Sequence, residues 1–254
     1  MTRVSDDNDG RLTFWEHLDE LRSTLLRSLA IVVLAAIVAF AMKEYLFAVV
    51  LAPRSSSFLT YRLLGIESLD IHLMNIGLTE QFMVHMRTAL YAGLLIASPY
   101  IIYELFRFVS PALYANERRI ALPVVVAAYA MFLLGALTNY LLIFPLTLQF
   151  LATYQVSPDV ANMLTLQSYI DTLLGMTLVM GLMFELPVVS ALLGQFGLVN
   201  ARQMAHYRRH AIVAILVIAA VITPTADAFT LFAVALPIYL LYELSINIVR
   251  ITKR

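Results

Sequence analysis

Cysteine is absent from this chain, and charged residues are scarce. Only 13% of the 254 residues are Asp, Glu, Lys or Arg, whereas a soluble domain has about 25%. The absence of cysteine excludes disulfides, thiolate metal sites and thiol catalysis. Hydrophobic residues make up 61% of the chain, and the mean hydropathy is +0.82. A soluble fold cannot bury that surplus, so the composition predicts an all-α integral membrane protein.

Sequence motifs of common enzymes are also missing. The chain has no HExxH, no GxGD and no glycine-rich phosphate loop. His206 and His210 are spaced to share one helix face, as metal ligands can be. They lie beside Arg208 and Arg209 with no carboxylate near them in the sequence, which favours contact with lipid headgroups. We therefore expect no catalytic residues, no metal and no other cofactor.

Six apolar runs set the expected topology. A span needs roughly 20 apolar residues to cross about 30 Å of hydrocarbon. Four runs suit this length, but the last two have about 14 residues each and cover only about 21 Å. We expect one transmembrane domain over residues 1–254, with short fifth and sixth spans. The expected spans are residues 25–42, 81–102, 120–146, 173–193, 210–223 and 229–242.

The two short runs allow a second interpretation. They could form one re-entrant hairpin, or helices buried among the others. We favour two true spans because basic residues before the pair, such as Arg202, are matched by basic residues after it, such as Arg250. Short spans would require local thinning of the bilayer or partner helices that cover the mismatch.

Lysine and arginine positions predict the orientation. Thirteen of the 17 fall on one side of the expected spans, and only Lys43, Arg54, Arg62 and Arg87 fall on the other. The positive-inside rule makes the first side cytosolic, so both termini are expected in the cytosol and the chain in the cytoplasmic membrane. Residues 1–23 are polar without the pattern of a cleaved signal, and we expect a cytosolic segment there. The thirteen are Arg3, Arg11, Arg22, Arg27, Arg107, Arg118, Arg119, Arg202, Arg208, Arg209, Arg250, Lys253 and Arg254.

One acidic residue lies in the middle of an expected span. Glu185 precedes Pro187 by two positions, and a proline inside a helix removes a backbone hydrogen bond and kinks it. Ionisable groups in spans usually face protein or a water-filled cavity. Three roles stay open for Glu185: a protonated packing residue, a receiver of a polar residue from a partner or cargo, and a coupling site of a proton-driven carrier.

Two segments on the expected cytosolic side combine acids with aromatics. The loop over residues 99–119 is rich in Tyr and Phe, and half of it could be an ordinary interfacial belt. Its Glu104 and Glu117 are expected at the membrane surface, where a carboxylate could bind a guanidinium bidentately. Before the first span, Glu16 and Glu20 share a helix face, although a simple surface helix anchored by Trp15 would also explain this segment.

These pieces, in this order, resemble the TatC family. The family's HLxELR pattern matches residues 17–22, and its F-E-x-P matches residues 184–187. Its Thr-Pro followed by Asp matches Thr223, Pro224 and Asp227. One departure is Glu104, where the family usually has glutamine. The cytosolic-loop motif of the family matches Pro99, Tyr103, Phe108, Pro111, Leu113, Tyr114, Glu117, Arg118 and Arg119.

The resemblance implies a concave helix bundle that acts as a receptor and not as an enzyme. It implies binding of the twin-arginine signal peptides of folded cargo, and recruitment of single-span TatA- and TatB-type subunits for export driven by the proton-motive force. It also implies self-association, contact with membrane lipids and no nucleic acid. Glu185 and Pro187 would form an intramembrane partner site, and Pro224 and Asp227 a periplasmic turn. The implied signal-peptide residues are Glu20, Arg22, Tyr103, Phe108, Pro111, Tyr114, Glu117, Arg118 and Arg119.

Two other functions remain as alternatives. A proton-coupled secondary transporter would use Glu185, but such folds often have two related halves, and we find no internal symmetry. A scaffold that only organises other membrane proteins is the third possibility, and without the loop motifs the sequence does not separate it from a receptor.

Overall fold

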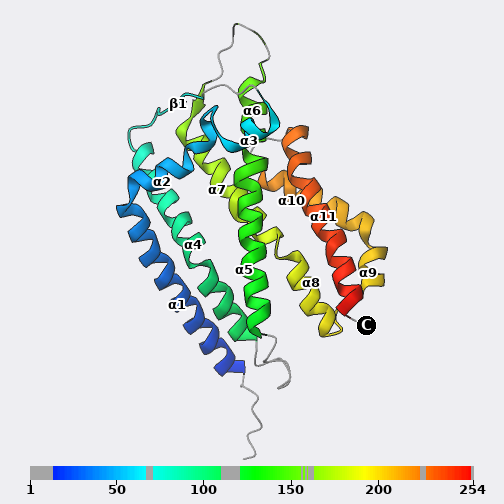
Figure 1. Cartoon of the computed structure of the whole chain (residues 1–254). Helices are drawn as coiled ribbons and strands as arrows, with labels where there is room; N and C mark the ends of the chain where they lie inside the picture. Colours follow the sequence, from blue (N-terminus) through cyan, green and yellow to red (C-terminus); the bar gives the residue numbers. More distant parts are fainter. Residues whose placement is uncertain are drawn as a thin grey trace, which may run out of the picture.

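Long helices standing side by side make up most of the chain (Figure 1). The computed structural model describes residues 14–66, 71–109, 121–155, 157, 159, 163–223 and 227–252. The elements are α1 (Phe14–Ala41), α2 (Lys43–Val50), η1 (Ala52–Arg54), α3 (Leu59–Leu64), β1 (Leu73–Met74), α4 (Glu80–Val109), α5 (Ala121–Thr138), the π-helical η4 (Asn139–Ile143), α6 (Phe144–Thr153), β2 (Leu164–Thr165), α7 (Leu166–Met183), α8 (Leu186–Gln195), α9 (Ala201–His206), α10 (Arg208–Ile222) and α11 (Ala228–Thr252).

Several of these helices can cross a membrane, which confirms the predicted class of fold. α10 has 15 residues, or about 22 Å, and is shorter than an ordinary span. It occupies the position of the predicted fifth span, and its crossing stays a prediction. Within the described residues, five helical segments are long and apolar enough to span: His17–Ala41, Glu80–Phe108, Leu122–Thr153, Leu166–Gln195 and Ala228–Thr252.

The helix at the predicted sixth span, residues 229–242, is longer than that span. α11 has 25 residues and continues to Thr252. The apolar run ends at Glu243, whose charge suggests the end of a span. In the structure Glu243 forms an ion pair with Arg208 of α10. Its Oε1 atom lies 2.7 Å from Arg208 Nε and accepts a hydrogen bond of 3.1 Å from Tyr239. An acid that is paired with a neighbouring helix can stay inside a helix at the membrane.

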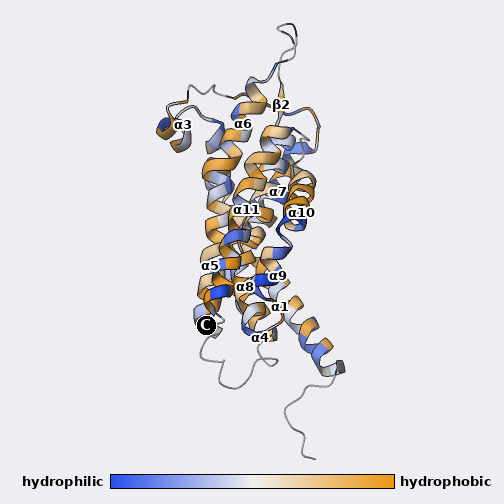
Figure 2. Ribbon diagram, turned by 90° about the vertical axis from the view of Figure 1, so that its right-hand side faces the viewer, coloured by the Kyte–Doolittle hydropathy of each residue, from blue (hydrophilic) through white to orange (hydrophobic). Residues whose placement is uncertain are grey.

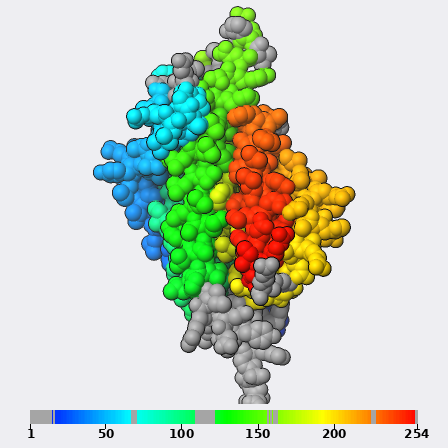
Figure 3. All heavy atoms as spheres, turned by 45° about the vertical axis from the view of Figure 1, so that its right-hand side comes forward, coloured from blue at the N-terminus to red at the C-terminus, as the bar shows by residue number. Residues whose placement is uncertain are grey.

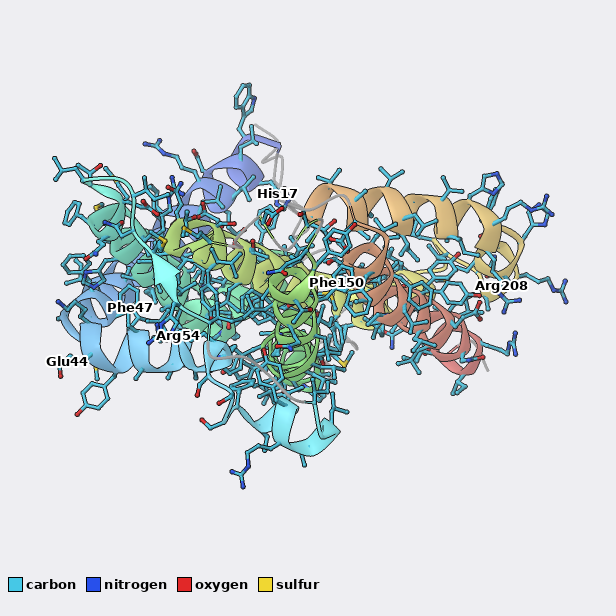
Figure 4. The ribbon with its side chains drawn as sticks, turned by 90° about the horizontal axis from the view of Figure 1, so that it is seen from above. His17, Glu44, Phe47, Arg54, Phe150 and Arg208 are labelled. Atoms are coloured by element: carbon cyan, nitrogen blue, oxygen red, sulfur yellow. The ribbon has the colours of Figure 1, made fainter. Side chains whose placement is uncertain are left out.

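The helices form an elongated array when viewed along their axes (Figure 4). α1, α2 and α4 lie at one edge, α5 and α7 lie in the middle, and α9, α10 and α11 lie at the other edge (Figures 1 and 4). The described chain begins and ends at the same end of the bundle, which we call the termini end. The end that carries α3, α6 and the β1–β2 pair is the opposite end.

Small residues let the helices approach closely. A Cβ atom added at Gly93 of α4 would lie 2.6 Å from the backbone nitrogen of Ala36 and 2.7 Å from the carbonyl oxygen of Val32 on α1. The same holds between α5 and α7, where a Cβ at Gly135 would lie 2.5 Å from the carbonyl oxygen of Met180. Close backbone contact at small residues is typical of helix pairs in membranes, where burial of apolar side chains supplies little driving force.

Apolar side chains cover both the interior and the outside of the bundle. Met176, Met180, Val234 and Ile238 are fully buried in a core that joins α7 to α11. The outer faces are apolar too, and hydrophobic colour extends over the middle of the helices in Figure 2. Figure 3 shows α11 standing beside the α5–α6 helix, with atoms of the α7–α8 segment between them. Such a surface suits lipid, since water would make it costly.

The opposite end is tied together by hydrogen bonds. Tyr61 of α3 donates to the carbonyl oxygens of Pro53 and Pro145, both at 3.1 Å. Burial raises the pKa of Tyr61 to about 12, so this hydroxyl stays protonated at neutral pH. Tyr169 donates to the carbonyl oxygen of Val50 at 2.9 Å. These hydrogen bonds hold α2, η1 and α3 against α6 and α7.

Candidate functional site

The two sequence motifs of the expected cytosolic side meet at the termini end. His17 lies near the start of α1, and Phe108 lies at the end of α4. Their rings stack with centroids 4.2 Å apart and an angle of 20° between their planes. α1 and α4 pack along their length, so residues about 90 positions apart in the sequence become neighbours. Figure 4 shows His17 on the side of the array away from Glu44 and Phe47.

Glu20 lies one helical turn after His17 and therefore on the same side of α1. Its side chain is half-buried, and it makes no ion pair with any residue of the described ranges. Arg22 is exposed and likewise has no ion-pair partner there. Tyr103 of α4 is 48% exposed at the same end of the bundle. These side chains remain accessible to a ligand.

The expected loop over residues 99–119 is wrong in its first half, which includes Glu104. α4 does not end near Ile102 but continues to Val109, so the first half of that segment is helical. Glu104 is only 2% exposed and is not a surface residue. Tyr100 donates a hydrogen bond of 2.8 Å to its Oε1, and Arg27 Nη2 of α1 lies 3.5 Å from its Oε2. Pro99 is tolerated inside α4, although it lacks a backbone donor.

This cluster around Glu104 is a feature that sequence reasoning missed. Arg107 completes it, with its Nη1 atom 3.7 Å from Glu104 Oε1. The spacing of Tyr100, Glu104 and Arg107 along one helix is the signal that could have revealed the local part. The contact with Arg27 comes from another helix, and no local pattern indicates it.

Part of the predicted site lies outside the described residues. The loop residues Pro111, Tyr114, Glu117, Arg118 and Arg119 belong to this part, and so does Pro224 of the expected periplasmic turn. Their roles stay predictions.

Glu185 lies where α7 and α8 are interrupted. α7 ends at Met183, α8 begins at Leu186, and Pro187 occupies the first turn of α8. The kink predicted from Pro187 is thus confirmed. Glu185 Oε1 is buried and has no hydrogen-bond partner in the described part of the chain. A buried acceptor without a donor is costly, particularly in a low dielectric.

An apolar groove opens beside Glu185. It has a volume of about 460 Å³ and lies between α4, α5, α7 and α8. Ser98 and Glu185 are the polar residues among its walls, which otherwise consist of apolar side chains such as Leu94, Phe132 and Leu182. Ser98 already donates to the carbonyl oxygen of Leu95 at 2.7 Å. The groove therefore offers an apolar surface with one buried acceptor, Glu185 Oε1, that lacks a donor among the described residues.

Asp227 lies at the opposite end of the molecule from Glu20. Its Oδ1 accepts a hydrogen bond of 2.7 Å from the backbone nitrogen of Thr230, which caps the start of α11. The geometry gives Asp227 a structural role as a helix cap at the turn between α10 and α11.

The histidine pair lies on the neighbouring helices α9 and α10. His206 and His210 are both exposed, and each packs edge-on against the ring of Tyr207. Across the described residues, no three His, Asp or Glu side chains group closely enough to hold a metal ion.

The five long apolar helices and the apolar outer surface define a multi-pass membrane protein. A profile of the protein family described as "Sec-independent protein translocase protein (TatC)" matches residues 16–237. The chain belongs to the TatC family and is thus a twin-arginine translocase subunit.

Individual relatives match over most of their length. The Sec-independent protein translocase protein TatC of Deinococcus radiodurans is 33% identical over 237 residues, which are 93% of this chain and 85% of the relative. The TatC protein of Koribacter versatilis is 34% identical over 246 residues, or 97% of this chain and 88% of the relative. That of Aquifex aeolicus is 32% identical over 240 residues, or 94% and 95%.

Solved structures agree with this assignment. A crystal structure of the twin-arginine translocase receptor TatC has a TM-score of 0.80 and 33% identity, and the match covers 94% of this chain and 100% of that chain. A second, in DDM, has a TM-score of 0.78 and 32% identity and covers 91% and 98%. These matches give no support to the proton-coupled carrier considered for Glu185.

Proposed function

We propose that this subunit binds the twin-arginine signal peptides of folded cargo at its termini end, facing the cytosol. The observation that carries the proposal is the stack of His17 on Phe108. This stack brings the N-terminal motif, which contains Glu20, next to the end of α4. The segment with Glu117 follows α4 directly in the sequence. Two carboxylates from separate segments match two adjacent guanidinium groups.

Charge chemistry supports this choice of ligand. A carboxylate binds a guanidinium through two parallel hydrogen bonds, a geometry that the ammonium of lysine cannot reproduce. Glu20 is half-buried and has no ion-pair partner among the described residues, so its carboxylate is available to a ligand. The buried Glu104 is already held by Tyr100 and Arg27 and is not part of the proposed contact.

The distribution of basic residues supports a cytosolic termini end in the cytoplasmic membrane. Described bases at that end include Arg22, Arg107 and Arg250, whereas the opposite end has Lys43 and Arg54 with few others. Cytosolic loops carry such an excess of Lys and Arg. A cytosolic termini end also exposes Glu20 on the side where cargo is synthesised.

The test is binding of a labelled twin-arginine peptide to the purified protein in detergent. Glu117→Gln and Glu20→Gln should each weaken binding by about tenfold to a hundredfold, the value of a charge-assisted hydrogen bond. Glu44→Gln is the matched control, because Glu44 is an exposed acid on α2. A twin-lysine peptide should bind weakly to all variants. Equal loss for both peptides, or no loss, would contradict the receptor role.

The groove beside Glu185 supports a second contact within the same function. We infer that it receives a single-span TatA- or TatB-type helix, whose polar side chain donates to Glu185, and that this assembly, together with self-association, serves export driven by the proton-motive force. The unsatisfied Oε1 atom and the apolar walls support the inference. A scaffold that does not bind cargo would assemble in the same way, so the peptide measurement distinguishes the two.

A further inference from the structure

A polar hollow at the termini end is separate from both sites described above. It has a volume of about 790 Å³ and lies between α9 and the last turns of α11. Arg202 and Gln203 of α9 line one side of it, and Arg250 and the buried Val249 of α11 line the other. Both arginines are exposed. Two guanidinium groups from different helices therefore flank one opening.

The frame of this hollow is fixed by contacts between the helices. Tyr242 of α11 donates a hydrogen bond of 2.8 Å to the carbonyl oxygen of Met204 in α9. Arg208, at the start of α10, binds Glu243 of α11 through both its Nε and Nη2 atoms, at 2.7 Å and 2.9 Å. Figure 4 shows Arg208 at this outer edge of the array. The two walls thus keep their spacing without a ligand.

Charge in this region is not balanced. Within the described residues from 195 to 252, Asp227 and Glu243 are the acids, and Glu243 is engaged by Arg208. Asp227 lies near the other end of α11, about 35 Å from Arg250 along a helix of 1.5 Å rise per residue. Neither Arg202 nor Arg250 makes an ion pair in the described part of the chain. The hollow is consequently a site of positive potential.

Exposed apolar side chains border the hollow. α10 starts at Arg208, and the turns that follow expose Ile212, Val213 and Leu216. On α11 the exposed Leu240 and Leu244 precede the hollow. An apolar outer surface therefore begins beside Arg202 and Arg250. The same arrangement is found where the hydrocarbon of a membrane meets the lipid headgroups.

We propose that Arg202 and Arg250 bind the phosphate of an anionic phospholipid whose acyl chains lie along the adjoining apolar helix surface. Basic pockets between transmembrane helices bind anionic headgroups in this manner. Arginine suits a phosphate because its fork of donors engages two oxygens at once. Phosphatidylglycerol satisfies the site, whereas the ammonium of phosphatidylethanolamine brings a positive charge close to the two arginines. The site is independent of the proposed signal-peptide site.

The experiment is a lipid titration followed by native mass spectrometry of the purified, delipidated full chain. Phosphatidylglycerol, phosphatidylethanolamine and phosphatidylcholine with identical acyl chains are compared on the unaltered protein. We expect clear selectivity for phosphatidylglycerol that weakens as salt is added. The Arg202→Gln/Arg250→Gln variant should lose about fivefold in affinity for each arginine removed.

Two controls sharpen the result. Arg54→Gln/Arg62→Gln makes the same change of charge at exposed positions of the opposite end and should bind phosphatidylglycerol normally. Glycerol phosphate, which has a phosphate but no acyl chains, tests whether the site binds a soluble phosphate instead of a lipid. The proposal is overturned if the three lipids bind equally, if the Arg202/Arg250 variant keeps its affinity, or if glycerol phosphate binds as tightly as the lipid. The comparison of the three lipids on the unaltered protein tests the proposal even if the variant does not fold.

Discussion

Glu104 and Glu185 are two acids inside the same helix bundle, and their surroundings differ. Glu104 accepts a hydrogen bond from Tyr100 and faces Arg27 and Arg107. Glu185 has a buried oxygen without a partner and borders an apolar groove. Glu104 Oε2 also lacks a hydrogen-bond partner in the described part of the chain, but it lies 3.5 Å from Arg27, whereas Glu185 makes no ion pair there. A carboxylate that is paired with bases of its own chain stabilises the fold, whereas one without such a partner beside open apolar space is suited to another molecule. The difference separates a structural acid from a candidate binding residue.

The largest effect on partner assembly is expected at Glu185. Glu185→Ala should leave the protein inserted and about as stable as before, because Glu185 Oε1 has no hydrogen-bond partner and the side chain makes no ion pair in the described part of the chain. Co-purification of TatA- or TatB-type subunits should fall by about tenfold, the value of one polar contact between membrane helices. Glu185→Gln keeps an acceptor oxygen and should retain part of the assembly. A fall in yield of the purified protein without loss of partners would instead make Glu185 a packing residue.

Glu104→Ala should have the reverse outcome. It removes the acceptor of Tyr100 and the counter-charge of two arginines, so stability should fall by about 2 kcal/mol. The measurement is the apparent Tm of the purified protein in one detergent, with Glu44→Ala as the control at an exposed acid. Partner assembly per folded molecule should not change. An unaltered Tm would show that the cluster contributes nothing to the fold.

Tyr100→Phe should have a smaller effect of the same kind. It deletes one hydrogen bond to Glu104 and leaves both arginines in place, which costs about 1 kcal/mol. The thermal unfolding series with Glu104→Ala measures it, and Tyr45→Phe, at an exposed position of α2, is the control. The double variant with Glu104→Ala should be no less stable than Glu104→Ala alone, because both changes remove the same contact.

Arg27→Gln should have the smallest effect. The side chain of Arg27 is 41% exposed and lies 3.5 Å from Glu104, so solvent screens much of the interaction. We expect a loss of about 0.5 kcal/mol or less, as for most exposed ion pairs. High salt should reduce the difference from the unaltered protein, and a loss as large as that of Glu104→Ala would contradict the screening argument.

Sequence reasoning succeeded where a signal is local. Long apolar runs predicted most of the membrane-crossing helices, and Pro187 predicted the break between α7 and α8. It placed two helix ends too early, because Glu104 was assigned to a loop and the last apolar run ends just before Glu243. Each is matched by an arginine of another helix, and a pattern along one helix does not contain its neighbour. The stack of His17 on Phe108 and the hollow between α9 and α11 depend on tertiary packing in the same way.

The most direct test of the receptor role is photo-crosslinking from two exposed tyrosine positions. A photoreactive residue replaces Tyr103, on the surface formed by the ends of α1 and α4, or Tyr45 of α2. A twin-arginine peptide should cross-link from position 103 and not from position 45, and an excess of unlabelled peptide should abolish the product. A twin-lysine peptide should cross-link far less. Equal cross-linking from both positions, or none from position 103, would contradict signal-peptide binding at the termini end.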